Sequence, residues 1–119
     1  MSRFEELKVW QKSVELAVKV YEITKKDPFN KDYGLRDQIR RSSVSISSNI
    51  AEGDQLDSDK SAIRHLRIAK GSCAELFTQT IISERIGYLS KPEFIFLKSE
   101  AEEILRMLTN LIKHRNGEK

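Results

Sequence analysis

The chain has 119 residues, with 21 lysines and arginines against 18 aspartates and glutamates, and its formal net charge is +3 when both histidines are neutral. A chain of this length buries one hydrophobic core, so we expect a single domain over residues 1–119 and exclude a multidomain enzyme. One cysteine cannot form an intramolecular disulfide, and no signal-peptide pattern opens the chain, which favours a cytoplasmic protein. Charged residues interrupt every apolar stretch well before the ~18 residues that a membrane-spanning helix needs, so we expect no membrane partner.

Glycine and proline are sparse, and they divide the chain into four segments with helical periodicity. The expected helices cover residues of about 7–26, 31–52, 58–86 and 91–114. No segment alternates apolar and polar residues as a strand does. Because the connections are only about four or five residues long, consecutive helices should be antiparallel neighbours. The sequence therefore predicts an all-α fold, an antiparallel up-down-up-down four-helix bundle.

Local signals mark the expected helix boundaries. The second helix should end at Gly53, where a positive φ angle at the C-cap would suit glycine. Either Asp57 or Ser58 can cap the third helix. The fourth begins with Ser90, and Glu93 three residues later completes the pattern of a capping box.

The expected first helix carries two apolar rows. One row has the alternating steps of three and four residues that are typical of a bundle core, and consists of Leu7, Trp10, Val14, Ala17, Tyr21 and Thr24. The other row lies roughly 100° around the helix axis and consists of Val9, Leu16, Val20 and Ile23. This second row is either a broad core contact with some ordinary exposed aliphatics, or a subunit interface that a homo-oligomer buries. We take the interface as the hypothesis to test.

The residues that carry catalytic or cofactor chemistry lack the spacing that such chemistry needs. No two glycines form a phosphate loop or a dinucleotide fingerprint. His65 and His114 lack the Glu-x-x-His spacing of a di-iron bundle. The serine-rich segment 42–48 has only His65 as an arguable base, so we interpret it as a close helix contact. Cys73 lies on a core stripe and is expected to be a small buried residue rather than a reactive thiol. We expect no enzyme activity, no cofactor and no metal.

Basic residues are concentrated on two of the expected helices. The third helix carries Lys60, Arg64, Arg67 and Lys70 along one flank, with no acidic residue between them. The second helix adds Arg36, Arg40 and Arg41. These bases form either a solvated face paired with nearby acids or a surface that contacts phosphates without reading sequence. Aromatic residues are missing from this set, which disfavours stacking of single-stranded bases.

Several motifs resemble one protein family. They are Tyr33-Gly34-Leu35, Gln38-Ile39-Arg40-Arg41, Ser45-Ile46-Ser47-Ser48-Asn49-Ile50-Ala51-Glu52-Gly53, Ile68-Ala69-Lys70-Gly71-Ser72 and Glu75-Leu76. The chain resembles the four-helix bundle protein family, which includes proteins encoded within intervening sequences of bacterial large-subunit ribosomal RNA genes. The resemblance implies an antiparallel bundle that assembles as a ring, typically a homopentamer, with no known enzyme activity. A related branch, the accessory protein of diversity-generating retroelements, implies binding to nucleic acid and a reverse transcriptase.

We therefore expect a non-enzymatic, ring-forming helical bundle that associates with ribosomal RNA or DNA through the bases of its second and third helices. The alternative is an oligomeric scaffold that binds a protein partner, in which case the basic flank is merely solvated.

Overall fold

The computed structural model describes residues 3–56 and 58–117. It contains the α-helices α1 (Lys8–Thr24), α2 (Tyr33–Gln55), α3 (Asp59–Arg85) and α4 (Lys91–Arg115), and the short 3-10 helices η1 (Arg3–Glu6) and η2 (Phe29–Lys31). Each end of the four α-helices lies within three residues of its expected position. No strand occurs in the described residues.

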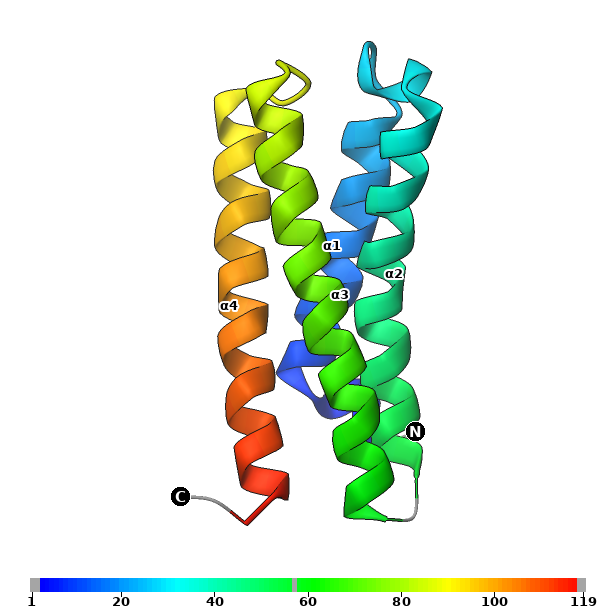
Figure 1. The fold of residues 1–119 in the computed structure, drawn as a ribbon, viewed down its shortest axis with the longest axis vertical. Coiled ribbons are helices and arrows are strands. Elements are labelled where there is room, and N and C mark those ends of the chain that lie inside the picture. Colours follow the sequence, from blue (N-terminus) through cyan, green and yellow to red (C-terminus); the bar gives the residue numbers. More distant parts are fainter. Residues whose placement is uncertain (1–2, 57, 118–119) are drawn as a thin grey trace.

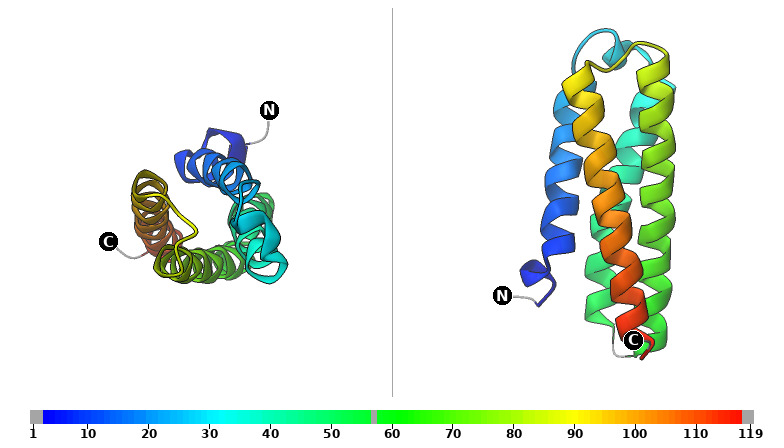
Figure 2. Two further views of the ribbon diagram at one scale, coloured as in Figure 1. Left: turned by 90° about the horizontal axis from the view of Figure 1, so that it is seen from above. Right: turned by 90° about the vertical axis from the view of Figure 1, so that its left-hand side faces the viewer.

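The four α-helices stand around a square (Figures 1 and 2), in which each helix packs on its neighbours in the sequence and α1 closes on α4. Consecutive helices run in opposite directions (Figure 1). This arrangement confirms the expected all-α, up-down-up-down bundle. None of the described helices is both long and apolar enough to cross a membrane.

The helices differ in length, which leaves one end of the bundle partly uncovered. α1 has 17 residues, whereas α2, α3 and α4 have 23, 27 and 25. The other three helices therefore project beyond the start of α1 (Figure 2). The start of α3 and the end of α4 meet at this projecting end (Figure 1).

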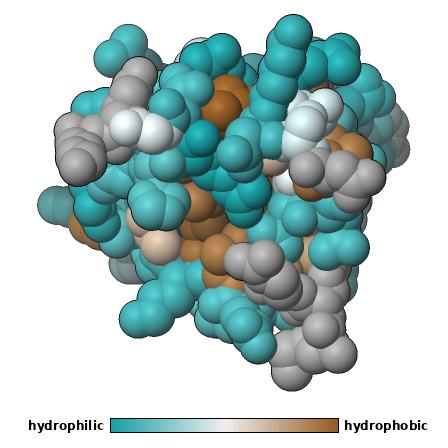
Figure 3. Space-filling model, turned by 90° about the horizontal axis from the view of Figure 1, so that it is seen from below, coloured by the Kyte–Doolittle hydropathy of each residue, from teal (hydrophilic) through white to brown (hydrophobic). Residues whose placement is uncertain are grey.

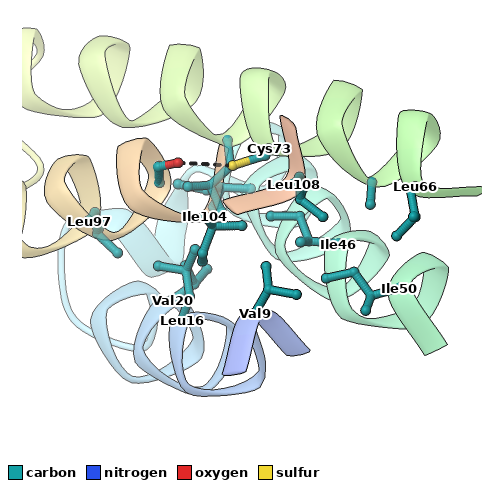
Figure 4. Packing of buried hydrophobic residues seen from close by; sticks show 14 of the residues in the cluster. Val9, Leu16, Val20, Ile46, Ile50, Leu66, Cys73, Leu97, Ile104 and Leu108 are labelled. Atoms are coloured by element: carbon teal, nitrogen blue, oxygen red, sulfur yellow. Dashed lines mark hydrogen bonds between the residues drawn. The ribbon is translucent and has the colours of Figure 1, made fainter. Parts of the chain in front are cut away.

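The core lies between the four helices and consists mainly of aliphatic side chains (Figure 4). Its most completely buried members include Leu16, Val20, Ile39, Ile46, Ile50, Leu66, Leu76, Leu97, Ile104 and Leu108. Cys73 is fully buried among them, and its Sγ atom donates a 3.2 Å hydrogen bond to the carbonyl oxygen of Ala101. Burial raises the pKa of the Cys73 thiol to about 11. Its complete burial confirms Cys73 as a small core residue. The raised pKa keeps the thiol protonated at neutral pH, which disfavours a reactive thiolate.

The orientation of α1 corrects the interface hypothesis. The row Val9, Leu16, Val20 and Ile23 is 0–5% exposed and belongs to the core of the subunit. It therefore cannot form a subunit interface, and that assignment was wrong. The row expected in the core instead lies partly outside, with Tyr21 40% exposed. The four aliphatic side chains have no polar group that would lose hydrogen bonds to water on burial. The indole N–H of Trp10 and the hydroxyl of Tyr21 do, which favours a half-exposed position for these two residues.

The junction of α2 and α3 also differs from the expectation. α2 continues past Gly53 to Gln55, and Gly53 has no positive φ. Gly53 is instead buried where the two helices approach closely, since a Cβ atom at this position would lie 3.0 Å from the carbonyl oxygen of Ala62. Ser58 caps α3 by accepting a hydrogen bond from the amide of Ser61, whereas Asp57 lies outside the described residues.

The expected capping box at the start of α4 is present. The hydroxyl of Ser90 accepts from the amide of Glu93, and the Glu93 carboxylate accepts from the amide of Ser90. These bonds satisfy two amide groups that the first turn of a helix otherwise leaves without acceptors.

Hydrogen bonds from the serine-rich segment link α2 to α3. Ser42 donates to the side-chain oxygen of Gln79 at 2.7 Å, and Ser72 donates to Ser45 at 2.9 Å. These contacts support the interpretation of this segment as a close helix contact. Asn49 of the family motif also contacts α3, because its Oδ1 atom lies 3.1 Å from the Nδ1 atom of His65.

Candidate nucleic-acid interface

Three of the predicted bases lie together at the projecting end of the bundle. Lys60, Arg64 and Arg67 are all exposed on the first turns of α3. Steps of four and three residues return to the same flank of a helix, and a rise of 1.5 Å per residue separates Lys60 from Arg67 by about 10 Å along the axis. None of the three forms an ion pair within residues 3–56 and 58–117. Their charges are therefore available to an external anion.

These bases border a groove of about 970 Å³ where α3 begins and α4 ends. The lining residues are Asp59, Lys60, Ser61, Ile63, Arg64, Arg67, Ile68, Arg115 and Asn116. Seen from this end, the surface is mostly hydrophilic around a small apolar area (Figure 3). Among the described residues, this lining contains cationic, acidic, polar and aliphatic side chains but no aromatic ring. It can hold phosphates, and it offers no platform on which a base could stack.

Arg115 enters this groove from α4 and is anchored by α2. Its Nη2 atom donates a 3.0 Å hydrogen bond to Oδ1 of Asp54, whose side chain is only 6% exposed. The other carboxylate oxygen of Asp54, Oδ2, is buried and has no hydrogen-bond partner in the described part of the chain. Because the carboxylate offsets the guanidinium charge, Arg115 contributes N–H donors to the groove more than net charge.

Arg115 was not among the predicted bases, because nothing local in the sequence connects the end of α4 with the start of α3. The available signal was weak. Arg115 follows Lys113 and His114 in the last turn of α4, and basic residues are common there because they interact favourably with the helix dipole.

Other predicted bases lie elsewhere. Lys70 is half-buried further along α3 and does not line the groove. Arg36 lies near the start of α2, at the opposite end of the bundle (Figure 1), where its Nε atom is 2.9 Å from Asp37 Oδ1. It also donates a hydrogen bond to the carbonyl oxygen of Asn30. The charge of Arg36 is therefore largely engaged within the subunit.

Arg40 and Arg41 are separate from the groove as well. Arg40 donates a 2.8 Å hydrogen bond to Thr24 Oγ1, and its guanidinium lies over the ring of Tyr21. Arg41 is exposed and lines a different, polar groove between α2 and α3. The structure thus brings together three of the seven predicted bases and adds Arg115 to them.

The groove combines cationic, polar and acidic side chains. No group of three or more His, Cys, Asp or Glu side chains that could hold a metal occurs among the described residues. Asp59 lines the groove beside the cations and lowers its net positive charge. What remains is a set of N–H donors and positive charges suited to anionic oxygens.

The fold and this groove define a class of protein, a small four-helix bundle with a basic surface at one end. The family model described as 23S rRNA-intervening sequence protein matches residues 5–110, and the chain belongs to this family. A similar solved structure is that of a protein with unknown function from the S23 ribosomal protein family of Bacteroides thetaiotaomicron. It is 29% identical, with a TM-score of 0.81, and the match covers 88% of this chain and 98% of that chain. A comparison with curated proteins finds no match.

Proposed function

We propose that this protein is a non-enzymatic accessory protein of the bacterial cytoplasm that self-associates and binds nucleic acid, either ribosomal RNA or DNA, without a cofactor. The observation that carries the proposal is the set of three cations Lys60, Arg64 and Arg67, which form no ion pair with any residue that the structure describes and share one groove with Arg115. Cations in this arrangement contact phosphates without reading sequence. The family description, which refers to 23S rRNA, supports the same proposal.

The groove favours duplex nucleic acid over single strands. Lys60, Arg64 and Arg67 are held at fixed spacing on α3, and no aromatic side chain of the described part of the chain lines the groove. Proteins that bind single strands without sequence preference combine positive charge with aromatic stacking platforms. We therefore expect duplex RNA or duplex DNA to bind more tightly than a single strand of the same length.

Salt dependence of binding tests the proposal. Labelled duplexes of ribosomal RNA and of DNA are titrated with the protein over a series of salt concentrations. Three phosphate contacts predict a slope of about −3 for log affinity against log salt with duplex DNA. The double variant Lys60→Glu with Arg64→Glu should flatten this slope by about 2, because each removed contact contributes about 1.

A matched control changes the net charge equally at another place. Arg41→Glu with Lys91→Glu alters two exposed bases that lie outside the groove and should keep the slope of the unmodified protein. Failure of both duplexes to bind at low salt would contradict the proposal. The alternative, a protein-binding scaffold, would then be favoured.

Self-association is the second part of the proposal, and the outer face of α1 carries it. Val14, Ala17, Val18 and Tyr21 line a groove of about 480 Å³, to which Ser47 of α2 also contributes. Val18 is 54% exposed. Adjacent exposed apolar residues are typical of interaction sites. The family resemblance implies a homopentamer, so light scattering should give several times the 13.8 kDa chain mass.

A further inference from the structure

The polar groove between α2 and α3 has no part in the proposed function. It has a volume of about 310 Å³, at the lower end of the range of about 300–1,000 Å³ for sites that hold small molecules. Every described residue that lines it is polar or charged, and none of them lines the basic groove. Among them are Arg41, Ser42 and Ser45 of α2 and Ser72, Glu75 and Gln79 of α3.

Hydrogen bonds between the two helices form the floor of this groove. Ser42 donates to Gln79 Oε1 at 2.7 Å, and Ser72 donates to Ser45 Oγ at 2.9 Å. Ser42, Ser72 and Gln79 are only 4–9% exposed. Because these side chains are buried and bonded across the helix contact, the floor is fixed before any ligand enters.

The Gln79 amide has an unused donor at this floor. Its Oε1 atom accepts from Ser42, whereas its Nε2 atom has no hydrogen-bond acceptor among residues 3–56 and 58–117. Gln79 is only 9% exposed and lines the groove. A buried N–H donor is stabilised when it is paired, so this amide favours a ligand that brings an acceptor atom.

Arg41 and Glu75 bring one positive and one negative charge to the same groove. Both are exposed, and neither forms an ion pair within the part of the chain that the structure describes. Arg41 precedes Ser42 and is therefore close to the level of Gln79, the partner of Ser42. Glu75 lies one turn of α3 away from Gln79, about 6 Å along the helix axis. The groove thus offers a cation and an amide donor at one level and a carboxylate about one turn away.

We propose that this groove binds a small zwitterion, an α-amino acid with a polar side chain. The carboxylate of the ligand accepts hydrogen bonds from the Arg41 guanidinium and the Gln79 amide, and its ammonium group donates to the Glu75 carboxylate. A ligand with a single charge would leave Arg41 or Glu75 without a partner and place that residue beside a like charge. Because the charged residues of the groove are only about one turn apart, the two charges of the ligand lie on neighbouring atoms, as in an α-amino acid.

The lining also selects the side chain of the amino acid. The hydroxyls of Ser45 and Ser72 offer donors and acceptors, whereas the described lining residues offer little apolar surface. A polar side chain exchanges its hydrogen bonds to water for bonds to these groups, and an aliphatic side chain gains little by entering. L-Glutamine and L-leucine are therefore suitable probes, because they are similar in size and opposite in polarity.

An NMR titration of the full chain tests this site. Added L-glutamine should shift the side-chain amide signals of Gln79 in a saturable manner, whereas L-leucine should not. Arg41→Gln and Glu75→Gln should each weaken the binding of L-glutamine by about tenfold or more, since each removes hydrogen bonds between charged groups. Circular dichroism checks that both variants keep their helices.

Two analogues of the probe separate the two charge contacts. Glutaramate lacks the ammonium group, so Glu75→Gln should not weaken its binding. L-Glutaminamide lacks the carboxylate, so Arg41→Gln should not weaken its binding. A tenfold loss in either of these combinations would overturn the assigned orientation of the ligand.

Charge-matched variants outside the groove serve as controls. Arg67→Gln and Glu84→Gln remove the same charges from exposed positions that do not line this groove, and both should keep the affinity of the unmodified protein for L-glutamine. Absence of a saturable shift with L-glutamine, an equal response to L-leucine, or unchanged affinity in Arg41→Gln overturns the proposal. Nucleic-acid binding is tested independently, because the two grooves share no residue.

Discussion

Arg115 and Asp54 join the last turn of α4 to the last turns of α2 through a 3.0 Å contact between Nη2 and Oδ1. The pair lies at the end of the bundle that also carries the basic groove, and Arg115 lines that groove. The guanidinium group of Arg115 therefore belongs both to an ion pair that links α4 to α2 and to the candidate binding surface. The two roles can be separated by experiment.

Removing Arg115 should destabilise the fold. The variant Arg115→Met keeps much of the aliphatic stem but leaves the carboxylate of Asp54 buried without its cation. We expect the free energy of unfolding to fall by about 3 kcal/mol. This is near the low end of the cost of breaking a buried ion pair, because the Arg115 side chain is 22% exposed. Urea denaturation followed by circular dichroism measures this change.

A second substitution and a control test the cause of that loss. Adding Asp54→Asn removes the unpaired charge, so the double variant should be more stable than Arg115→Met alone. Arg106→Met breaks an exposed pair with Glu103 and should change stability little. Equal destabilisation by Arg115→Met and Arg106→Met would show that the buried charge is not the cause.

Alanine substitutions at Gly53 and Gly71 should have opposite effects. A Cβ atom at Gly53 would approach the Ala62 carbonyl oxygen to 3.0 Å and the His65 Cβ atom to 3.3 Å, and both belong to the packed α2–α3 seam. We expect Gly53→Ala to cost about 1–3 kcal/mol through overpacking. Gly71 lies inside α3 with nothing within 4 Å of the added carbon, so Gly71→Ala should stabilise the fold by about 0.5–1 kcal/mol.

Chemical denaturation of both variants measures these differences. Because the two changes are chemically identical and both lie within helices, helix propensity contributes the same sign at each position. Stabilisation by Gly53→Ala would contradict the close approach of α2 and α3.

The thiol of Cys73 should make stability depend on alkaline pH. Its pKa in the folded protein is about 11, above the ordinary value of 9.0, because burial disfavours the thiolate. The folded state therefore prefers the protonated thiol. This contribution is complete below about pH 9 and is lost as the pH rises to about 11.

The variant Cys73→Ala isolates that effect. It lacks the titrating thiol, so the stability difference between the two proteins should shrink as the pH rises through this window. A thiol reagent at pH 8 should label the unmodified protein only after urea unfolds it. Rapid labelling of the folded protein would show that Cys73 is accessible.

The extent of the helices follows from local features of the sequence. Periodicity, the capping box at Ser90 and Glu93, and the sparse glycines placed each helix end within three residues. Those signals act over one or two turns, so they do not depend on how the helices meet. Gly53 shows where prediction from local signals fails, because a glycine that ends a helix and a glycine at a close helix contact look the same in sequence. Only the neighbouring Ala62 distinguishes them.

The four helices, their antiparallel order and the row from Lys60 to Arg67 can all be predicted from the sequence, since helical spacing alone puts those bases on one flank. Packing of the helices sets which apolar row of α1 faces the core, because both rows are apolar and only contacts with α2 and α4 distinguish Leu16 from Tyr21. The packing of the helices also determines which residues line the groove. Arg115 joins Lys60 across a helix contact that no local spacing encodes, whereas Arg40 is drawn to Thr24 and Tyr21 at the other end of the bundle.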